Sequence, residues 1–199
     1  ELSANAIDAH KDNGKENVPF DVHLPGHCNG LLNGSDRKYF SIRDYGKGLT
    51  EVEMISIYTI YGGSTKRTTN DFIGGFGIGS KSPFAYSNQF EVVSYNNGKK
   101  QHYICYINNE AYPCITKVED VETNEPSGLE VIVNIANEDD CNQFNFEAIK
   151  QYSYYDVRPN CNIELPDLVP YIKTKDYCIY TKTQNEKAIS KNIAPAMRP

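Results

Sequence analysis

The first half of the chain alternates between helix-type and strand-type patterns of apolar residues. Apolar positions at helical spacing run through residues 1–13 and stop at Asn13-Gly14, a pair that commonly ends a helix. Apolar and polar residues alternate over 39–44, which predicts a strand. In that strand Asp44 shares a face with two apolar residues, so we expect a carboxylate to point inward.

A second helix is predicted to begin after residue 50. Thr50-Glu51-Val52-Glu53 matches a capping box, in which a Thr and a Glu three residues apart bind backbone N–H groups that open a helix. The apolar run 54–60 follows it directly. Polar, Gly-containing segments at 28–36 and 61–78 are predicted to be loops, and a short helix is expected from Gly79.

Strand-type patterns take over from residue 89. The segments 89–95 and 101–107 flank Asn96-Asn97-Gly98-Lys99, and an Asn-Gly pair between two such runs is a strong hairpin signal. Further strands are expected near 110–118 and 128–135. Helices followed by an antiparallel meander predict an α+β fold built as a two-layer sandwich.

The C-terminal part carries a helix and an extension. Asp139 or Asp140 is expected to cap a helix that runs to about Tyr155. The Pro- and Tyr-rich residues that follow form either a small added element or the start of a second domain. We therefore divide the chain into residues 1–135, which hold the candidate chemistry, and residues 136–199.

Composition and charge restrict the function only broadly. The chain has 199 residues, 39% of them hydrophobic and 23% charged, and a formal net charge of −6. This acidic balance gives no general reason to expect nucleic acid or an anionic membrane as a partner. No apolar stretch approaches the ~20 residues that a membrane-spanning helix needs. Six cysteines are scattered without a C-x-x-C pair, which argues against a zinc site and a small disulfide scaffold: Cys28, Cys105, Cys114, Cys141, Cys161 and Cys178. We expect a cytoplasmic protein in which most of these thiols are reduced.

Three polar clusters supply candidate chemistry, and the first lies in the opening helix. Glu1, Asn5 and Asp8 are spaced i, i+4 and i+7, so they share one helix face. Carboxylate and carboxamide oxygens are ligands that Mg²⁺ accepts beside substrate phosphates. The alternative is a solvated helix face with acidic residues near the N-terminus of the helix.

The second cluster surrounds Asp44, in Arg43-Asp44-Tyr45-Gly46-Lys47-Gly48-Leu49-Thr50. A carboxylate on an apolar strand face must find a hydrogen-bond partner or change its protonation state, and the exocyclic amine of adenine is a suitable partner. Gly46 and Gly48 would let the backbone turn tightly against a flat base. The alternative is an ordinary D-x-G-x-G turn after an edge strand.

The third cluster is Gly74-Gly75-Phe76-Gly77-Ile78-Gly79-Ser80-Lys81-Ser82. Glycines at alternate positions before a helix offer backbone N–H groups and the positive end of the helix dipole to a phosphate. Lys81 and Ser80 add a charge and a hydroxyl, and Lys66 and Arg67 in the preceding loop are placed to close over a nucleotide. The spacing does not match a Walker A loop. The alternative is a flexible Gly-rich loop.

In this order and spacing the three clusters resemble the GHKL family of ATPases, named for gyrase, heat-shock chaperone, histidine kinase and MutL. The matching boxes are E-x-x-x-N-A-x-D-A from Glu1, D-x-G-x-G-L-T from Asp44 and G-F-G-I-G from Gly75. The resemblance covers residues 1–135. It implies a Bergerat fold, in which helices cover one face of a mixed, mostly antiparallel sheet, with ATP and Mg²⁺ as ligands.

The resemblance also implies a role for each matched residue. Glu1 would polarise the attacking water, Asn5 would bind Mg²⁺ and Asp8 would support the pocket. Asp44 would bind the adenine amine, and Gly46 and Gly48 would shape that wall. The residues expected at the phosphates are Lys66, Gly75, Gly77, Ile78, Gly79, Ser80 and Lys81.

One box departs from the family pattern. The expected Gly-Thr before the last strand falls on Ser127-Gly128-Leu129-Glu130, where Leu129 replaces the Thr that contacts the base, and Ser127 is the candidate to take over that contact. The presence of Asp8 favours the hydrolytic branch of the family over the histidine kinases. We interpret the histidines as surface or structural residues: His10, His23, His27 and His102.

A narrower likeness leads to a functional expectation. The runs Y-G-G-S-T-K-R at 61–67 and I-G-G-F-G-I-G-S-K-S-P-F-A-Y at 73–86 resemble the bacteriophage rIIA lysis-inhibition family, which is associated with lysis timing and protection against host exclusion systems. This implies slow Mg-ATP hydrolysis that switches a lid at about 62–78, in the cytoplasm of a host cell. A homodimer of the full-length protein and an unidentified host or phage protein are the expected partners.

Two further points concern activity. Because the chain opens on Glu1 in mid-helix, we expect a trimmed start and poor hydrolysis by this fragment. An alternative function is a catalytically weak nucleotide-binding scaffold that engages a host protein. A third is a role in a gyrase-like or MutL-like assembly on nucleic acid, although the acidic balance and the scattered basic residues speak against direct nucleic-acid binding.

Overall fold

The computed structural model of the protein describes residues 1–25, 38–60 and 79–181. The loops expected at 28–36 and 61–78 lie outside these residues. The helices and strands are, in chain order, α1 (Leu2–Asp12), β1 (Asp21–His23), β2 (Tyr39–Arg43), α2 (Glu51–Thr59), the 3-10 helix η1 (Gly79–Ala85), β3 (Gln89–Asn96), β4 (Lys99–Ile107), β5 (Pro113–Glu122), β6 (Gly128–Asn134), α3 (Glu138–Tyr152), β7 (Asn160–Cys161), β8 (Ile172–Lys173) and β9 (Cys178–Ile179).

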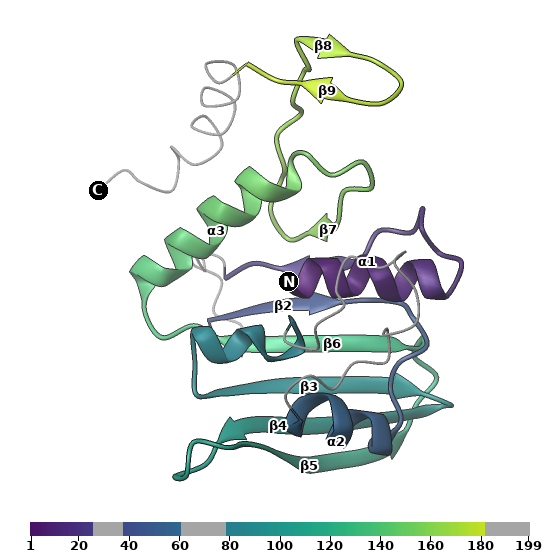
Figure 1. Ribbon diagram of the computed structural model, residues 1–199, viewed down its shortest axis with the longest axis vertical. Coiled ribbons are helices and arrows are strands. Elements are labelled where there is room, and N and C mark those ends of the chain that lie inside the picture. The colour runs from purple at the N-terminus through teal and green to yellow at the C-terminus, as the bar shows by residue number, and fades with distance from the viewer. Residues whose placement is uncertain (26–37, 61–78, 182–199) are drawn as a thin grey trace, which may run out of the picture.

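Seven strands form one mixed sheet in the order β5-β4-β3-β6-β2-β1-β7. Neighbouring strands are antiparallel except β1 and β7, which run parallel. The helices α1, α2 and α3 pack on one face of this sheet (Figure 1). The predicted α+β fold, a two-layer sandwich with a mostly antiparallel sheet, is therefore confirmed.

Inward-facing apolar side chains form two clusters between the helices and the sheet. One cluster joins α2 and α3 to the centre of the sheet and includes the fully buried Met54 and Phe90. The other joins α1 and the end of α3 to β1 and β2, around Phe20 and Tyr152. Removal of these side chains from water is the main force that holds the helices on the sheet. It also fixes the orientation of α1, which carries the first candidate cluster.

Two local predictions are confirmed in detail. The Thr50 backbone N–H donates to Glu53 Oε2 at 2.8 Å, and the Glu53 N–H donates to Thr50 Oγ1 at 3.4 Å, so the capping box opens α2. In the β3–β4 hairpin Asn97 and Gly98 both have positive φ, 51° and 73°. That is the geometry of a two-residue type I′ turn. Both features depend on residues within four positions of each other.

Other boundaries differ from the predictions. The strand expected near 110–118 begins only at Pro113, because Asn108 Oδ1 accepts hydrogen bonds from the N–H groups of Glu110 and Tyr112 and holds that segment in a turn. The short helix from Gly79 is present, but as a 3-10 helix that contains a proline.

The caps predicted for the C-terminal helix are wrong. Asn137 is the N-cap of α3, and its side chain accepts from the Asp140 N–H at 2.9 Å. Asp139 and Asp140 lie in the first turn, where their charge faces the positive end of the helix dipole. The helix ends at Tyr152 rather than near Tyr155.

The C-terminal segment contributes to both the sheet and a separate hairpin. The strand β7 extends the main sheet beside β1, whereas β8 and β9 pair only with each other. No helix in the described part of the chain is long and apolar enough to cross a membrane. The cysteines within that part are free, and Cys105 and Cys141 are buried.

Candidate functional site

The polar face predicted for α1 meets the start of η1. A Cβ built on Gly79 would lie 2.7 Å from Glu1 Oε2 and 3.3 Å from Asn5 Nδ2. A Cβ at residue 79 would push the Glu1 carboxylate away and crowd the Asn5 amide, so the glycine lets both groups lie against this backbone. The structure thus brings together two residues of the first cluster and the last glycine of the third.

The polar face of α1 runs from solvent into the interior. Glu1 is exposed, Asn5 is half-buried and Asp8 is fully buried. The three side chains therefore lie at successive depths along one helix.

The Asp44 carboxylate is held from two segments of the chain. Asp44 is 7% exposed, and its Oδ1 accepts hydrogen bonds from the N–H groups of Gly46 at 2.9 Å and Leu129 at 3.2 Å. Its own N–H donates to the Leu129 carbonyl at 2.9 Å. The inward direction predicted for this side chain is confirmed. These two amide donors hold the carboxylate in place through contacts within the protein alone.

Glycines allow the backbone segments around Asp44 to touch. A Cβ on Gly128 would lie 1.9 Å from the Asp44 carbonyl oxygen, and a Cβ on Gly48 would lie 2.2 Å from the Tyr95 carbonyl oxygen. Gly48 also has a φ of +70°, which favours glycine. A Cβ on Gly46 would meet the Ala9 Cβ at 3.0 Å, so the turn after β2 packs directly on α1.

Polar side chains of β3 bind the same turn, and sequence analysis missed them. Ser94 is fully buried; its Oγ donates to the Leu49 carbonyl at 2.7 Å and accepts from the Leu49 N–H at 2.8 Å. Asn96 Nδ2 donates to the Lys47 carbonyl at 2.8 Å. A signal for Ser94 exists in the sequence, because it is a polar residue at an inward position of an apolar strand.

His10 joins α1 to the turn, in agreement with its interpretation as a structural residue. Its Nδ1–H donates to the Val18 carbonyl at 2.9 Å, and its Nε2 accepts from the Tyr45 N–H at 2.7 Å. These bonds require the neutral ring. Burial lowers the pKa of His10, as does the nearby Lys15 ammonium, while the Val18 carbonyl and Asp21 act in the opposite direction.

The other described histidines also have structural or surface positions. His23 stacks on Tyr39 with ring centroids 4.0 Å apart, and His102 Nε2 lies 2.9 Å from Glu91 Oε2. His27 lies outside the described residues.

Lys81, expected at the phosphates, is buried against the end of α2. Only 5% of it is exposed, and its ammonium donates to the Ile57 carbonyl at 2.5 Å. Carbonyl groups at a helix C-terminus carry partial negative charge, so they attract this cation. Burial lowers the pKa of Lys81. In this structure Lys81 therefore caps the end of α2.

The remaining candidate residues differ in how far they are buried and in whether the structure describes them. Ser80 Oγ is buried and has no hydrogen-bond partner among the described residues. Ser127 is exposed immediately before β6, and the backbone of Leu129, not its side chain, contacts Asp44. Four predicted site residues lie outside the described part of the chain: Lys66, Gly75, Gly77 and Ile78.

Comparisons with known proteins identify the fold. No family model and no curated protein matches the chain. The ATPase and transducer domains of DNA topoisomerase II from Balamuthia mandrillaris superpose with a TM-score of 0.54 and 15% identity, over 81% of this chain and 45% of that one. The ATPase region of Saccharomyces cerevisiae topoisomerase II bound to ICRF-187 (dexrazoxane) gives a TM-score of 0.51 and 16% identity, over 81% and 46%.

A second structure of the ATPase region of Saccharomyces cerevisiae topoisomerase II gives a TM-score of 0.51 and 14% identity, over 99% of this chain and 51% of that one. The chain therefore spans about half the length of these structures. The likeness shows that the chain has the fold of these ATPase regions.

Proposed function

We propose that the chain binds Mg-ATP between α1, η1 and the Asp44 turn, and hydrolyses it slowly to drive a conformational switch. The observation that carries this proposal is the convergence of Glu1 and Asn5 on Gly79. Asp44 belongs to the same site because its turn packs through Gly46 on Ala9 of α1. One helix thus connects a candidate base-binding carboxylate to a candidate metal and water site.

The residues present fit a magnesium nucleotide. Asn5 supplies an amide oxygen for Mg²⁺, and its amide group lies beside Gly79, at the end of the glycine-rich segment expected at the phosphates. When bound, the metal neutralises charge on the phosphates. Glu1 accepts a proton from the attacking water, Asp44 accepts a hydrogen bond from the adenine amine, and Asp8 supports Asn5 from the interior.

The biological setting follows from sequence runs that lie largely outside the described residues. From the likeness at 61–67 and 73–86 we propose a phage rIIA-like role in lysis inhibition or counter-defence, in the cytoplasm of the host cell. The switch would act on the segment 62–78, and a longer form of the protein would dimerise. Its further partner would be a host or phage protein.

Calorimetric titration with Mg²⁺ and a non-hydrolysable ATP analogue tests the nucleotide site. We expect the wild type to bind and Asp44→Asn to lose about 5- to 150-fold in affinity, roughly 1–3 kcal/mol, because the adenine amine would face a mismatched partner. The matched control is Asp120→Asn on β5, an exposed aspartate remote from Asp44. Absence of binding by the wild type, or equal affinities of the two variants, would contradict the proposal.

A second candidate function is a nucleotide-binding scaffold with weak catalysis. It is favoured by Lys81, whose ammonium donates a hydrogen bond to the Ile57 carbonyl at the end of α2. Leu129, in place of the family Thr, favours the same function. Removal of the Glu1 carboxylate distinguishes the two functions: turnover of ATP should fall if the chain is an ATPase and stay unchanged if it is a scaffold.

A further inference from the structure

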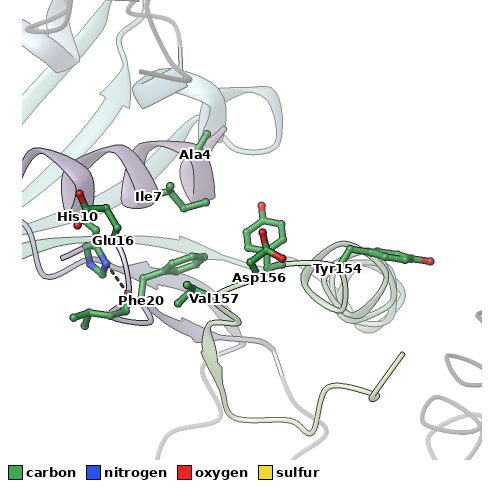
Figure 2. Close-up of a pocket in the computed structure, with 10 residues that line it drawn as sticks. Ala4, Ile7, His10, Glu16, Phe20, Tyr154, Asp156 and Val157 are labelled. Atoms are coloured by element: carbon green, nitrogen blue, oxygen red, sulfur yellow. Dashed lines mark hydrogen bonds between the residues drawn. The ribbon is translucent and has the colours of Figure 1, made fainter. Parts of the chain in front are cut away.

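A cavity lies on a different face of α1 from Glu1, Asn5 and Asp8. Figure 2 shows it between α1, the segment that leads into β1 and the segment that follows α3. Its volume is about 460 Å³, within the range of pockets that hold small organic ligands. Its lining residues are Ala4, Ile7, His10, Glu16, Val18, Phe20, Tyr154, Tyr155, Asp156 and Val157.

The wall of this cavity is mainly apolar and aromatic. Ala4 and Ile7 come from α1, Phe20 from the segment before β1, and Val157 from beyond α3. The Phe20 ring meets the Tyr155 ring edge to face, with centroids 6.4 Å apart. These side chains suit a ligand with a compact apolar or aromatic body.

The charged side chains that line the cavity are all acidic, and the nearby Lys15 ammonium donates to the Tyr45 carbonyl at 2.7 Å. Glu16 and Asp156 are the carboxylates of the cavity, and no Lys or Arg is among the ten lining residues. His10 adds no positive charge, because its two ring nitrogens are engaged by the Val18 carbonyl and the Tyr45 N–H in the neutral form. A cationic group on the ligand would therefore complement the two carboxylates.

We propose that this cavity binds a small amphipathic organic cation: an amine carried on an aromatic or branched apolar body. The apolar wall receives the body, while one of the two exposed carboxylates, Glu16 on one side of the cavity or Asp156 on the other (Figure 2), receives the ammonium group. The site is separate from the proposed nucleotide site, and its test contains no nucleotide. Failure of one proposal is thus distinguishable from failure of the other.

Three probes of the same shape and different charge test the proposal: 4-phenylbutylamine, 4-phenyl-1-butanol and 4-phenylbutyrate. Each is titrated into the ¹⁵N-labelled chain at neutral pH and followed by two-dimensional NMR. We expect the amine to saturate with shifts at Ile7, Phe20 and Val157, the alcohol to bind at least fivefold more weakly, and the carboxylate not to bind. Equal binding of all three, no binding of the amine, or shifts elsewhere would overturn the proposal.

Variants separate local complementarity from general attraction to an acidic protein. The double variant Glu16→Gln/Asp156→Asn should reduce amine affinity to that of the alcohol and leave the alcohol unchanged. Glu147→Gln/Asp139→Asn, two exposed acids of α3 outside the cavity, removes the same charge and should change neither. Equal loss in both double variants would overturn the site.

A filling variant and a peptide complete the test. Ala4→Leu should abolish binding of both amine and alcohol while the spectrum keeps its dispersion; retained binding would overturn the site. All four charge substitutions are at exposed positions, so the test does not depend on the folding of Ala4→Leu. If the blocked tripeptide Leu-Lys-Leu binds at these residues and the amine does not, the assignment to a small cation is wrong.

Discussion

The two ends of the candidate nucleotide site are built differently. At the Asp44 end, backbone segments touch through Gly48 and Gly128, and two amide groups hold the carboxylate. At the Glu1 end, an exposed glutamate serves as the N-cap of α1 without a side-chain capping bond, and Asn5 is half-buried. The fold therefore fixes the Asp44 end, proposed to bind the base, through its own backbone contacts, while the end expected at the phosphates is positioned mainly by helix register.

The largest effect is expected from adding a side chain at the Asp44 end, where two backbone segments touch. Gly128→Ala places a Cβ 1.9 Å from the Asp44 carbonyl oxygen, so β6 and the turn must separate. We expect the free energy of unfolding to fall by about 3–5 kcal/mol in urea denaturation. Gly98→Ala is the control: its φ is +73° but its nearest neighbour is 4.0 Å away, so about 1 kcal/mol is expected. Equal losses would show that the close approach does not limit stability.

The role of the Glu1 end is tested by a substitution that removes the carboxylate and leaves the fold unchanged. Glu1→Gln keeps size and polarity but removes the base, so we expect turnover to fall about 100-fold or more. Affinity for a non-hydrolysable ATP analogue should stay within about twofold, in contrast to Asp44→Asn. Steady-state ATPase assays and calorimetry measure the two quantities. Unchanged turnover in Glu1→Gln would favour the scaffold function.

A smaller effect tests the hydrogen bonds at the fixed end. Ser94 is buried, and Ser94→Ala removes the hydroxyl that is the side-chain partner of both the Leu49 N–H and the Leu49 carbonyl. We expect a loss of about 1–3 kcal/mol in the free energy of unfolding, measured in urea. Ser56→Ala, at an exposed position of α2, should change it by less than about 0.5 kcal/mol. If both variants are equally stable, Ser94 does not hold the turn.

The smallest expected effect is a dependence on pH through His10. Its folded pKa lies below the ordinary value of 6.5, so above that value the ring is neutral in both states and its hydrogen bonds are intact. As the pH falls below about 6.5, the unfolded chain takes up the proton first, and stability decreases until the folded pKa is reached. Urea denaturation at pH 7.5 and 5.5 should show a smaller difference in His10→Gln than in the wild type. Identical differences would exclude His10 as the cause.

The sequence determined the features that depend on near neighbours or on a repeat of polarity. The capping box of Thr50 and Glu53 and the turn at Asn97-Gly98 each lie within four residues. The α+β class and the inward position of Asp44 followed from the alternation of apolar residues. Even here, local competition decided details: Asn137, rather than an aspartate, caps α3.

Only the tertiary structure decided how distant segments meet. The motif resemblance assigned Glu1 and Gly79 to one site, but only the structure shows their contact, the Leu129 amide on Asp44 and the Lys81 ammonium on the end of α2. Each of these contacts joins residues far apart in the chain, and its geometry depends on how the helices pack on the sheet. Periodicity specifies which face of an element is buried, but the direction of a single side chain depends on the neighbours that packing brings to it.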